Sequence, residues 1–215
     1  MFSDPSKCHE LLDGLGRINE VDCHPLFGVR LLELGAGGGL PSWLAMKCGA
    51  QVVCTDQSIP DRIRCLAECA QRNLNDLQRD LDEENPILGH AKKVRVCPYD
   101  WGSATDEVIS NMKREVDTDD CGLFDIILAA DCVYLPQCHS VLLDSIQKLL
   151  STCGVALLPF ALHGNTSDDD VWAILKLARK KGFFVEVLES VQLTPQAIGM
   201  GEKRGLVNMV RLKKI

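Results

Sequence analysis

The sequence contains no Cys-x-x-Cys pair, although 11 of its 215 residues are cysteine. Structural zinc sites need closely spaced Cys or His ligands, so we expect no bound metal. The odd number of cysteines and their irregular spacing also argue against a disulfide framework. Several cysteines lie within apolar runs: Cys54, Cys97, Cys132 and Cys153. We therefore expect buried free thiols in a reducing compartment, the cytoplasm or the nucleus.

Long apolar runs and clusters of basic residues are also lacking. No stretch approaches the roughly 18 apolar residues of a membrane span, and the first residues lack the apolar core of a secretory signal. The net charge is −7, and the Lys and Arg residues are scattered, whereas binding to nucleic-acid phosphates needs them clustered. We therefore expect no membrane and no nucleic-acid partner. An acidic surface favours a basic protein segment instead.

Glycine, by contrast, is concentrated at one place. An apolar run, residues 29–34, is followed by Gly35, Gly37, Gly38 and Gly39, and then by an apolar segment, residues 40–48. This pattern predicts a strand, a sharp turn and a helix. Glycines let a main chain approach a ligand closely, and the helix N-terminus presents free N–H groups, so the loop is typical of a nucleotide-like ligand. An ordinary tight strand-to-helix connection is the alternative.

The spacing of these glycines indicates which ligand the loop holds. The dinucleotide fingerprint requires glycine at the first, third and sixth positions, but the sixth position after Gly35 is Leu40. In addition, the carboxylate of Glu33 precedes the loop and would repel a pyrophosphate. It suits a ligand that carries a positive charge and a free amino group. A nicotinamide-dependent dehydrogenase remains an alternative, because its alternation of strands and acids is similar.

Three further strand ends carry polar side chains. The strand 51–56 ends at Asp56, where an acid accepts hydrogen bonds from ribose hydroxyls; capping of the next helix is the alternative. The strand 93–97 precedes Asp100 and Trp101, which suit the amino group and the ring of adenine. A buried strand beginning at Phe124 precedes Asp131 and Tyr134.

These motifs resemble a known family. Glu33-Leu-Gly-Ala-Gly37 resembles the first motif of class I S-adenosylmethionine-dependent methyltransferases. Asp131-Cys-Val-Tyr134 resembles the motif after the fourth strand in the protein-lysine methyltransferase branch, whose members modify calmodulin, valosin-containing protein and translation elongation factors. The resemblance implies S-adenosyl-L-methionine as cofactor, with Asp131 orienting the target amine and Tyr134 lining its channel. For Asp131 a helix cap is the alternative, and for Tyr134 plain packing. The implied cofactor-binding residues are Glu33, Gly35, Gly37, Gly39, Asp56, Asp100, Trp101 and Ala130.

Strand and helix patterns alternate along the chain, as in an α/β fold. The expected fold is a Rossmann-like, seven-stranded, mostly parallel sheet with an antiparallel C-terminal hairpin and helices on both faces. Helices are expected near 40–48, 60–76, 137–151 and 169–182, with Asp168 to Asp170 capping the last of these. The fifth strand is expected at 152–160, the hairpin at 183–193 and 206–212, and a solvated loop at 80–86. Residues 1–28 are expected to form an N-terminal extension, and residues 29–215 a single domain.

The expected function is N-methylation of a lysine in a protein substrate, such as a translation factor or a chaperone-type ATPase, by a monomeric enzyme. A small-amine N-methyltransferase and a non-catalytic binding module with the methyltransferase fold are the alternatives. The chain departs from the family in one respect. Its relatives carry a longer N-terminal segment with a tryptophan, whereas the first tryptophan here is Trp43. This predicts either a shortened N-terminus or a more open cofactor pocket.

Overall fold

The protein folds around one seven-stranded sheet in the computed structural model, which describes residues 24–112, 123–162, 166–193 and 205–215. The strand order is β3-β2-β1-β4-β5-β7-β6. Strands β1 to β5 pair in parallel, and β7 pairs antiparallel to both β5 and β6. This confirms the expected fold class; the connection 194–204 lies outside the described residues. The strands are β1 (Arg30–Leu34), β2 (Gln51–Asp56), β3 (Arg95–Pro98), β4 (Phe124–Leu128), β5 (Leu150–Phe160), β6 (Phe183–Gln192) and β7 (Leu206–Lys214).

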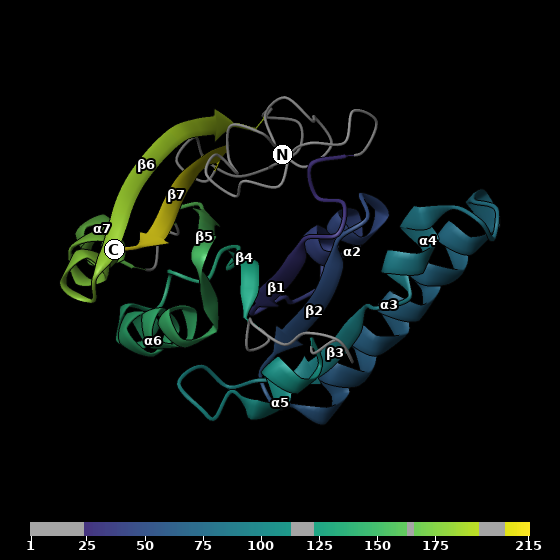
Figure 1. Cartoon of the computed structure of the whole chain (residues 1–215). Coiled ribbons are helices and arrows are strands. Elements are labelled where there is room, and N and C mark those ends of the chain that lie inside the picture. Colours follow the sequence, from purple (N-terminus) through teal and green to yellow (C-terminus); the bar gives the residue numbers. More distant parts are fainter. Residues whose placement is uncertain (1–23, 113–122, 163–165, 194–204) are drawn as a thin grey trace.

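Helices cover both faces of the sheet (Figure 1). On one face, α2 (Leu40–Lys47), α3 (Pro60–Asp80) and α4 (Pro86–Ala91) pack on β1, β2 and β3. On the other face, α6 (His139–Leu149) packs on β4 and β5, and α7 (Asp168–Lys180) packs on β6. Val108 of the short helix α5 (Asp106–Ser110) belongs to the same apolar core as these two helices. The central strands are therefore buried on both sides, which explains why they are continuous apolar runs.

Three helices differ from their predicted extents for local reasons. Helix α3 runs to Asp80 rather than to residue 76. The predicted solvated loop ends where α4 begins, because the Asn85 side chain accepts a hydrogen bond from the amide of Ile87 (3.0 Å) and caps that helix. Helix α7 has Ser167 at its N-cap position, so its three aspartates do not cap it. They lie in its first turn, where their charge complements the helix dipole.

The cysteines follow the predicted burial with one exception. Cys54, Cys97 and Cys132 are buried, and burial raises the pKa of each thiol, so these side chains stay protonated. The prediction for Cys153 is wrong, because this residue is exposed. Strand β5 pairs with β4 at Leu150 and then again at Val155, across a register shift, and Cys153 lies in the irregular stretch between these pairs.

Packing extends slightly upstream of the predicted domain boundary. Leu26 is fully buried in the core beneath α2, and the amide of Gly28 donates to the carbonyl of Gly49 (2.9 Å). Residues 1–23 of the predicted N-terminal extension lie outside the described residues. Among the described residues, no helix is both long and apolar enough to cross a bilayer, and no three His, Cys, Asp or Glu side chains gather as a metal site.

Candidate functional site

The candidate site lies at the carboxyl ends of the parallel strands. β1 lies between β2 and β4, so the order of the strands reverses beside it. Ligands of open α/β sheets bind at such a switch point. A cavity of about 600 Å³ opens there, within the range of small-molecule sites. Its described lining residues are Gly35, Gly37, Asp56, Gln57, Arg62, Tyr99, Asp100, Trp101, Asp131, Cys132, Tyr134, Leu135, Cys138 and Val141.

The glycine loop after β1 needs its glycines for two separate reasons. Gly35, Gly37 and Gly39 have φ of +67°, +56° and +69°, a region that side chains disfavour. At Gly35 and Gly39 space is also lacking. A Cβ atom would lie 2.8 Å from the sulfur of Cys132 at the first position and 2.5 Å from the Trp43 ring at the second. At Gly37 a Cβ would meet nothing, so the main chain there is open to the cavity.

Glu33 lies behind this loop rather than in the cavity. The side chain is buried and is not among the described lining residues. Its carboxylate accepts hydrogen bonds from the amide (3.1 Å) and the hydroxyl of Ser42, in the first turn of α2. Desolvation by burial raises the Glu33 pKa to about 7, although the Ser42 bonds oppose this rise. Glu33 therefore holds the N-terminus of α2 against β1, and its predicted contact with the cofactor stays a prediction.

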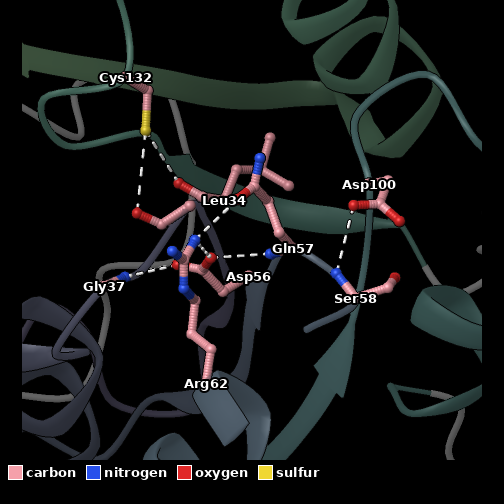
Figure 2. A network of polar contacts seen from close by, with 9 residues as sticks. Leu34, Gly37, Asp56, Gln57, Ser58, Arg62, Asp100 and Cys132 are labelled. Carbon is pink, nitrogen blue, oxygen red and sulfur yellow. Dashed lines mark hydrogen bonds and ion pairs between the residues drawn. The ribbon is translucent and has the colours of Figure 1, made fainter. Parts of the chain in front are cut away.

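Asp56 joins the glycine loop to α3 (Figure 2). Its carboxylate accepts hydrogen bonds from the amides of Gly37 and Gln57, both at 2.7 Å, and pairs with Arg62 at 2.9 Å. Asp56 does not cap α3, because that helix begins at Pro60 with Ile59 as its N-cap. The carboxylate thus borders the cavity, as a ribose-binding group would.

The loop after β3 forms the next wall of the cavity. Asp100 accepts a hydrogen bond from the amide of Ser58 (3.2 Å), which joins the loops after β2 and β3 (Figure 2). The Trp101 ring is partly buried and lies against Gly35, 3.0 Å from where a Cβ would be. An acceptor for an amino group and an aromatic face therefore lie side by side, as adenine recognition requires.

The segment after β4 completes the site from the other side of β1. Among the described residues, Asp131 is the one non-glycine residue with a positive φ (+54°), and its amide donates to the carbonyl of Pro159 (2.7 Å). Asp131 does not cap a helix. The 3-10 helix η1 (Pro136–Cys138) and α6 have Leu135 and Cys138 as N-caps. The Tyr134 side chain is 43% exposed and lines the cavity, so plain core packing does not describe it.

Seven of the predicted site residues therefore line one cavity: Gly35, Gly37, Asp56, Asp100, Trp101, Asp131 and Tyr134. Gly39 begins α2 instead, and Ala130 accepts a hydrogen bond from the Cys132 thiol through its carbonyl (3.3 Å). Among the lining residues that were not predicted, Gln57, Tyr99 and Cys132 each adjoin a predicted one, so sequence position could have indicated them. Arg62, Cys138 and Val141 come from the following helices or their ends, and no local pattern marks them.

The arrangement fits S-adenosylmethionine. An open main chain at Gly37, a ribose acceptor at Asp56 and an adenine wall at Asp100 and Trp101 surround a cavity of suitable size. The fold and the site together define a class I S-adenosylmethionine-dependent methyltransferase. The model of the family described as "Lysine methyltransferase" matches residues 16–170. The chain belongs to this family, which overturns the dehydrogenase alternative and agrees with the missing sixth glycine.

Curated relatives carry the same activity in their names. The chain is 28% identical to a protein N-terminal and lysine N-methyltransferase of Gibberella zeae, over 89% of this chain and 71% of that protein. It is 31% identical to a protein of the same name in Candida glabrata, over 85% of this chain and 65% of the relative. The chain thus spans about two thirds of the length of these relatives.

Solved structures support the fold. A precorrin-6y C5,15-methyltransferase from Geobacter metallireducens superposes with a TM-score of 0.58 at 14% identity, over 96% of this chain and 85% of that one. The glycopeptide N-methyltransferase MtfA superposes with a TM-score of 0.58 at 13% identity, over 98% of this chain and 90% of that one. At such low identity these likenesses establish the shared architecture alone.

Proposed function

We propose that this chain methylates the ε-amino group of a lysine in a protein substrate. One observation carries the proposal. Asp131 and Tyr134, which follow β4, line the same cavity as Gly37, Asp56 and Trp101, which follow β1, β2 and β3. An amine held at the first pair is therefore adjacent to a cofactor held by the second group. Membership of the lysine methyltransferase family supports the same acceptor chemistry.

The chemistry requires positioning more than acid–base catalysis. When bound, S-adenosylmethionine supplies an electrophilic methyl group: the amine lone pair forms an N–C bond while the C–S bond breaks and leaves its electron pair on sulfur. The protein must hold the nucleophile in line with that bond. Lysine, with an ordinary pKa near 10.4, must first lose a proton to solvent, and desolvation in the aromatic channel beside Tyr134 favours the neutral amine.

Asp131 is the residue proposed to orient this amine. Its carboxylate can accept a hydrogen bond from the amine N–H and leave the lone pair directed at the methyl group. The left-handed backbone at Asp131 and the bond from its amide to Pro159 fix where the side chain starts. Tyr134 is proposed to line the channel, since its partly exposed ring borders the cavity.

A second acceptor follows from the relatives. Their names include protein N-termini beside lysine, so an α-amino group is the second candidate. A small amine and a binding module without activity remain from the sequence interpretation. We keep a translation factor or a chaperone-type ATPase as the first substrates to assay. A cytoplasmic location and a monomeric state are also part of the proposal, and the buried, protonated thiols support the location.

The test is transfer of a labelled methyl group from S-adenosylmethionine into lysate proteins, followed by mass spectrometry of the labelled peptides. Methyl groups on lysine side chains are the expected result. A matched lysate in which lysines have been chemically blocked should lose the label. Label on α-amino groups alone would replace lysine by the N-terminal acceptor. Binding of S-adenosylhomocysteine without any transfer would favour the binding module, and the absence of binding would refute the proposal.

A further inference from the structure

One buried hydroxyl in α6 has contacts that the packing of the helix does not explain. Ser145 is fully buried, and its neighbours on the buried face of α6 are apolar: Leu142, Leu143, Ile146 and Leu149. Serine is a poorer helix former than alanine. At a buried helical position surrounded by apolar side chains, alanine would therefore serve the helix better. The hydroxyl at this position needs another reason.

The hydrogen bonds of this hydroxyl supply that reason. Ser145 donates to the carbonyl of Val141 (2.9 Å), one turn earlier in α6. It accepts from the hydroxyl of Tyr99 (3.0 Å) and from the amide of Gly102 (2.9 Å). A serine hydroxyl has one proton and two lone pairs, so all of its capacity is used.

The two donors lie on either side of the adenine wall. Tyr99 and Gly102 immediately flank Asp100 and Trp101, which line the cavity. At its start, this loop is also held by the bond from the amide of Tyr99 to the carbonyl of Asp56 (2.8 Å). Ser145 holds the other end. The Tyr99 ring is itself buried, so its hydroxyl meets Ser145 inside the protein rather than in the cavity.

We infer that Ser145 is a positioning residue for the cofactor: it holds the segment 99–102 against α6, so that Asp100 and Trp101 are ordered before the cofactor binds. This inference rests on the proposed function, because it takes the segment 99–102 to be the adenine wall. Without the hydroxyl, the segment has to be ordered at the moment of binding. The cofactor is then bound more weakly, while the residues that hold the acceptor amine are not affected.

The test compares Ser145→Ala and Tyr99→Phe with the wild-type chain, by calorimetric titration with S-adenosylhomocysteine. Either variant should raise the Kd about tenfold, which corresponds to about 1.4 kcal/mol. Adding Tyr99→Phe to Ser145→Ala should change the Kd little further, because both remove the same contact. Ser140→Ala, at an exposed serine of the same helix, is the matched control and should stay within about twofold.

Kinetics separate positioning from a loss of folded protein. In the lysine methylation assay, Ser145→Ala should raise the KM for S-adenosylmethionine with kcat close to wild type, whereas a smaller folded fraction would lower kcat with KM unchanged. If wild type binds the ligand and both variants bind it equally well, the inference is wrong. If wild type does not bind, the proposed function fails and the inference fails with it. Should Ser145→Ala not fold, Tyr99→Phe alone decides.

Discussion

Asp131 combines a strained backbone with a place in the cavity wall. Its φ of +54° is a conformation that costs most side chains about 1 kcal/mol or more, and aspartate tolerates it better than most. Strained residues persist where the surrounding structure holds them, and they concentrate at active sites. At Asp131 the bond from its amide to Pro159 provides that hold. The strain and the position together favour a role in the reaction.

Two substitutions separate the carboxylate from the backbone it stands on. Asp131→Asn keeps the shape of the side chain and tolerates the left-handed conformation. Methyl transfer should fall about 100-fold, the scale of a lost positioning contact, with the Kd for S-adenosylhomocysteine nearly unchanged. Asp131→Gly relieves the strain, so its melting temperature should equal or exceed that of wild type while methyl transfer falls equally. An Asp131→Asn variant with wild-type turnover would remove Asp131 from the reaction.

Glu33 should give the protein a pH-dependent stability. Its pKa rises from 4.5 to about 7 on folding because burial disfavours the charged form. Between these values the folded state binds more protons than the unfolded state, so the free energy of unfolding falls as pH rises through this window. The full effect is roughly 3 kcal/mol, at about 1.4 kcal/mol per pKa unit.

Glu33→Gln should remove this pH dependence, because its amide oxygen can still accept from Ser42 but does not ionise. We expect the free energy of unfolding of wild type, relative to Glu33→Gln, to fall from pH 4.5 to about pH 8 and then to level off. Urea unfolding of both proteins across this range measures the difference. A constant difference would show that Glu33 titrates normally.

At the scale of single elements, the glycines of the loop between β1 and α2 divide into two kinds. An alanine methyl at Gly39 would collide with the Trp43 ring, whereas one at Gly37 would project into open space beside the cavity. Both substitutions carry a backbone cost of about 1–2 kcal/mol. Gly39→Ala adds a cost of about 1–3 kcal/mol for overpacking. Gly37→Ala should therefore lose less stability and more affinity for the cofactor.

Melting temperatures and titrations with S-adenosylhomocysteine on the same preparations measure both effects. The expected pattern is crossed: the larger drop in melting temperature for Gly39→Ala, and the larger rise in Kd among folded protein for Gly37→Ala. Equal losses of stability in the two variants would contradict the assignment of Gly39 to packing and Gly37 to the ligand.

The elements also show what local sequence could predict. The central strands and the glycine loop were predictable because each is a continuous pattern: an apolar run buried on both faces, then residues that need a positive φ. The side chains that approach from α3 and α6 were not. Arg62 pairs with Asp56, and Ser145 holds the segment 99–102, only after the chain has folded. Cys153 was missed because a register shift exposes it, and no pattern within β5 encodes the register of its neighbour.

For the whole molecule, the site is assembled from the ends of four strands, so a ligand that binds it stabilises the complete fold. At 100 times its Kd, S-adenosylhomocysteine should add about 2.7 kcal/mol to the free energy of unfolding. For a chain of this size that corresponds to a rise in melting temperature of about 5–11 °C. The same concentration of NAD should give no rise. A shift with NAD that equals the shift with S-adenosylhomocysteine would contradict the identification of the cofactor.

The insertion of β7 between β5 and β6 has a consequence for synthesis on the ribosome. β6 is made before β7, yet its sheet neighbour is β7 and not β5. While the chain is growing, β6 therefore waits without a partner, with Phe184, Val187 and Val191 on its surface. The strands that carry the cavity, β1 to β4, are already complete by then. The half of the protein that binds the cofactor can thus form first, and the β6 edge is the part most in need of protection by a chaperone during translation.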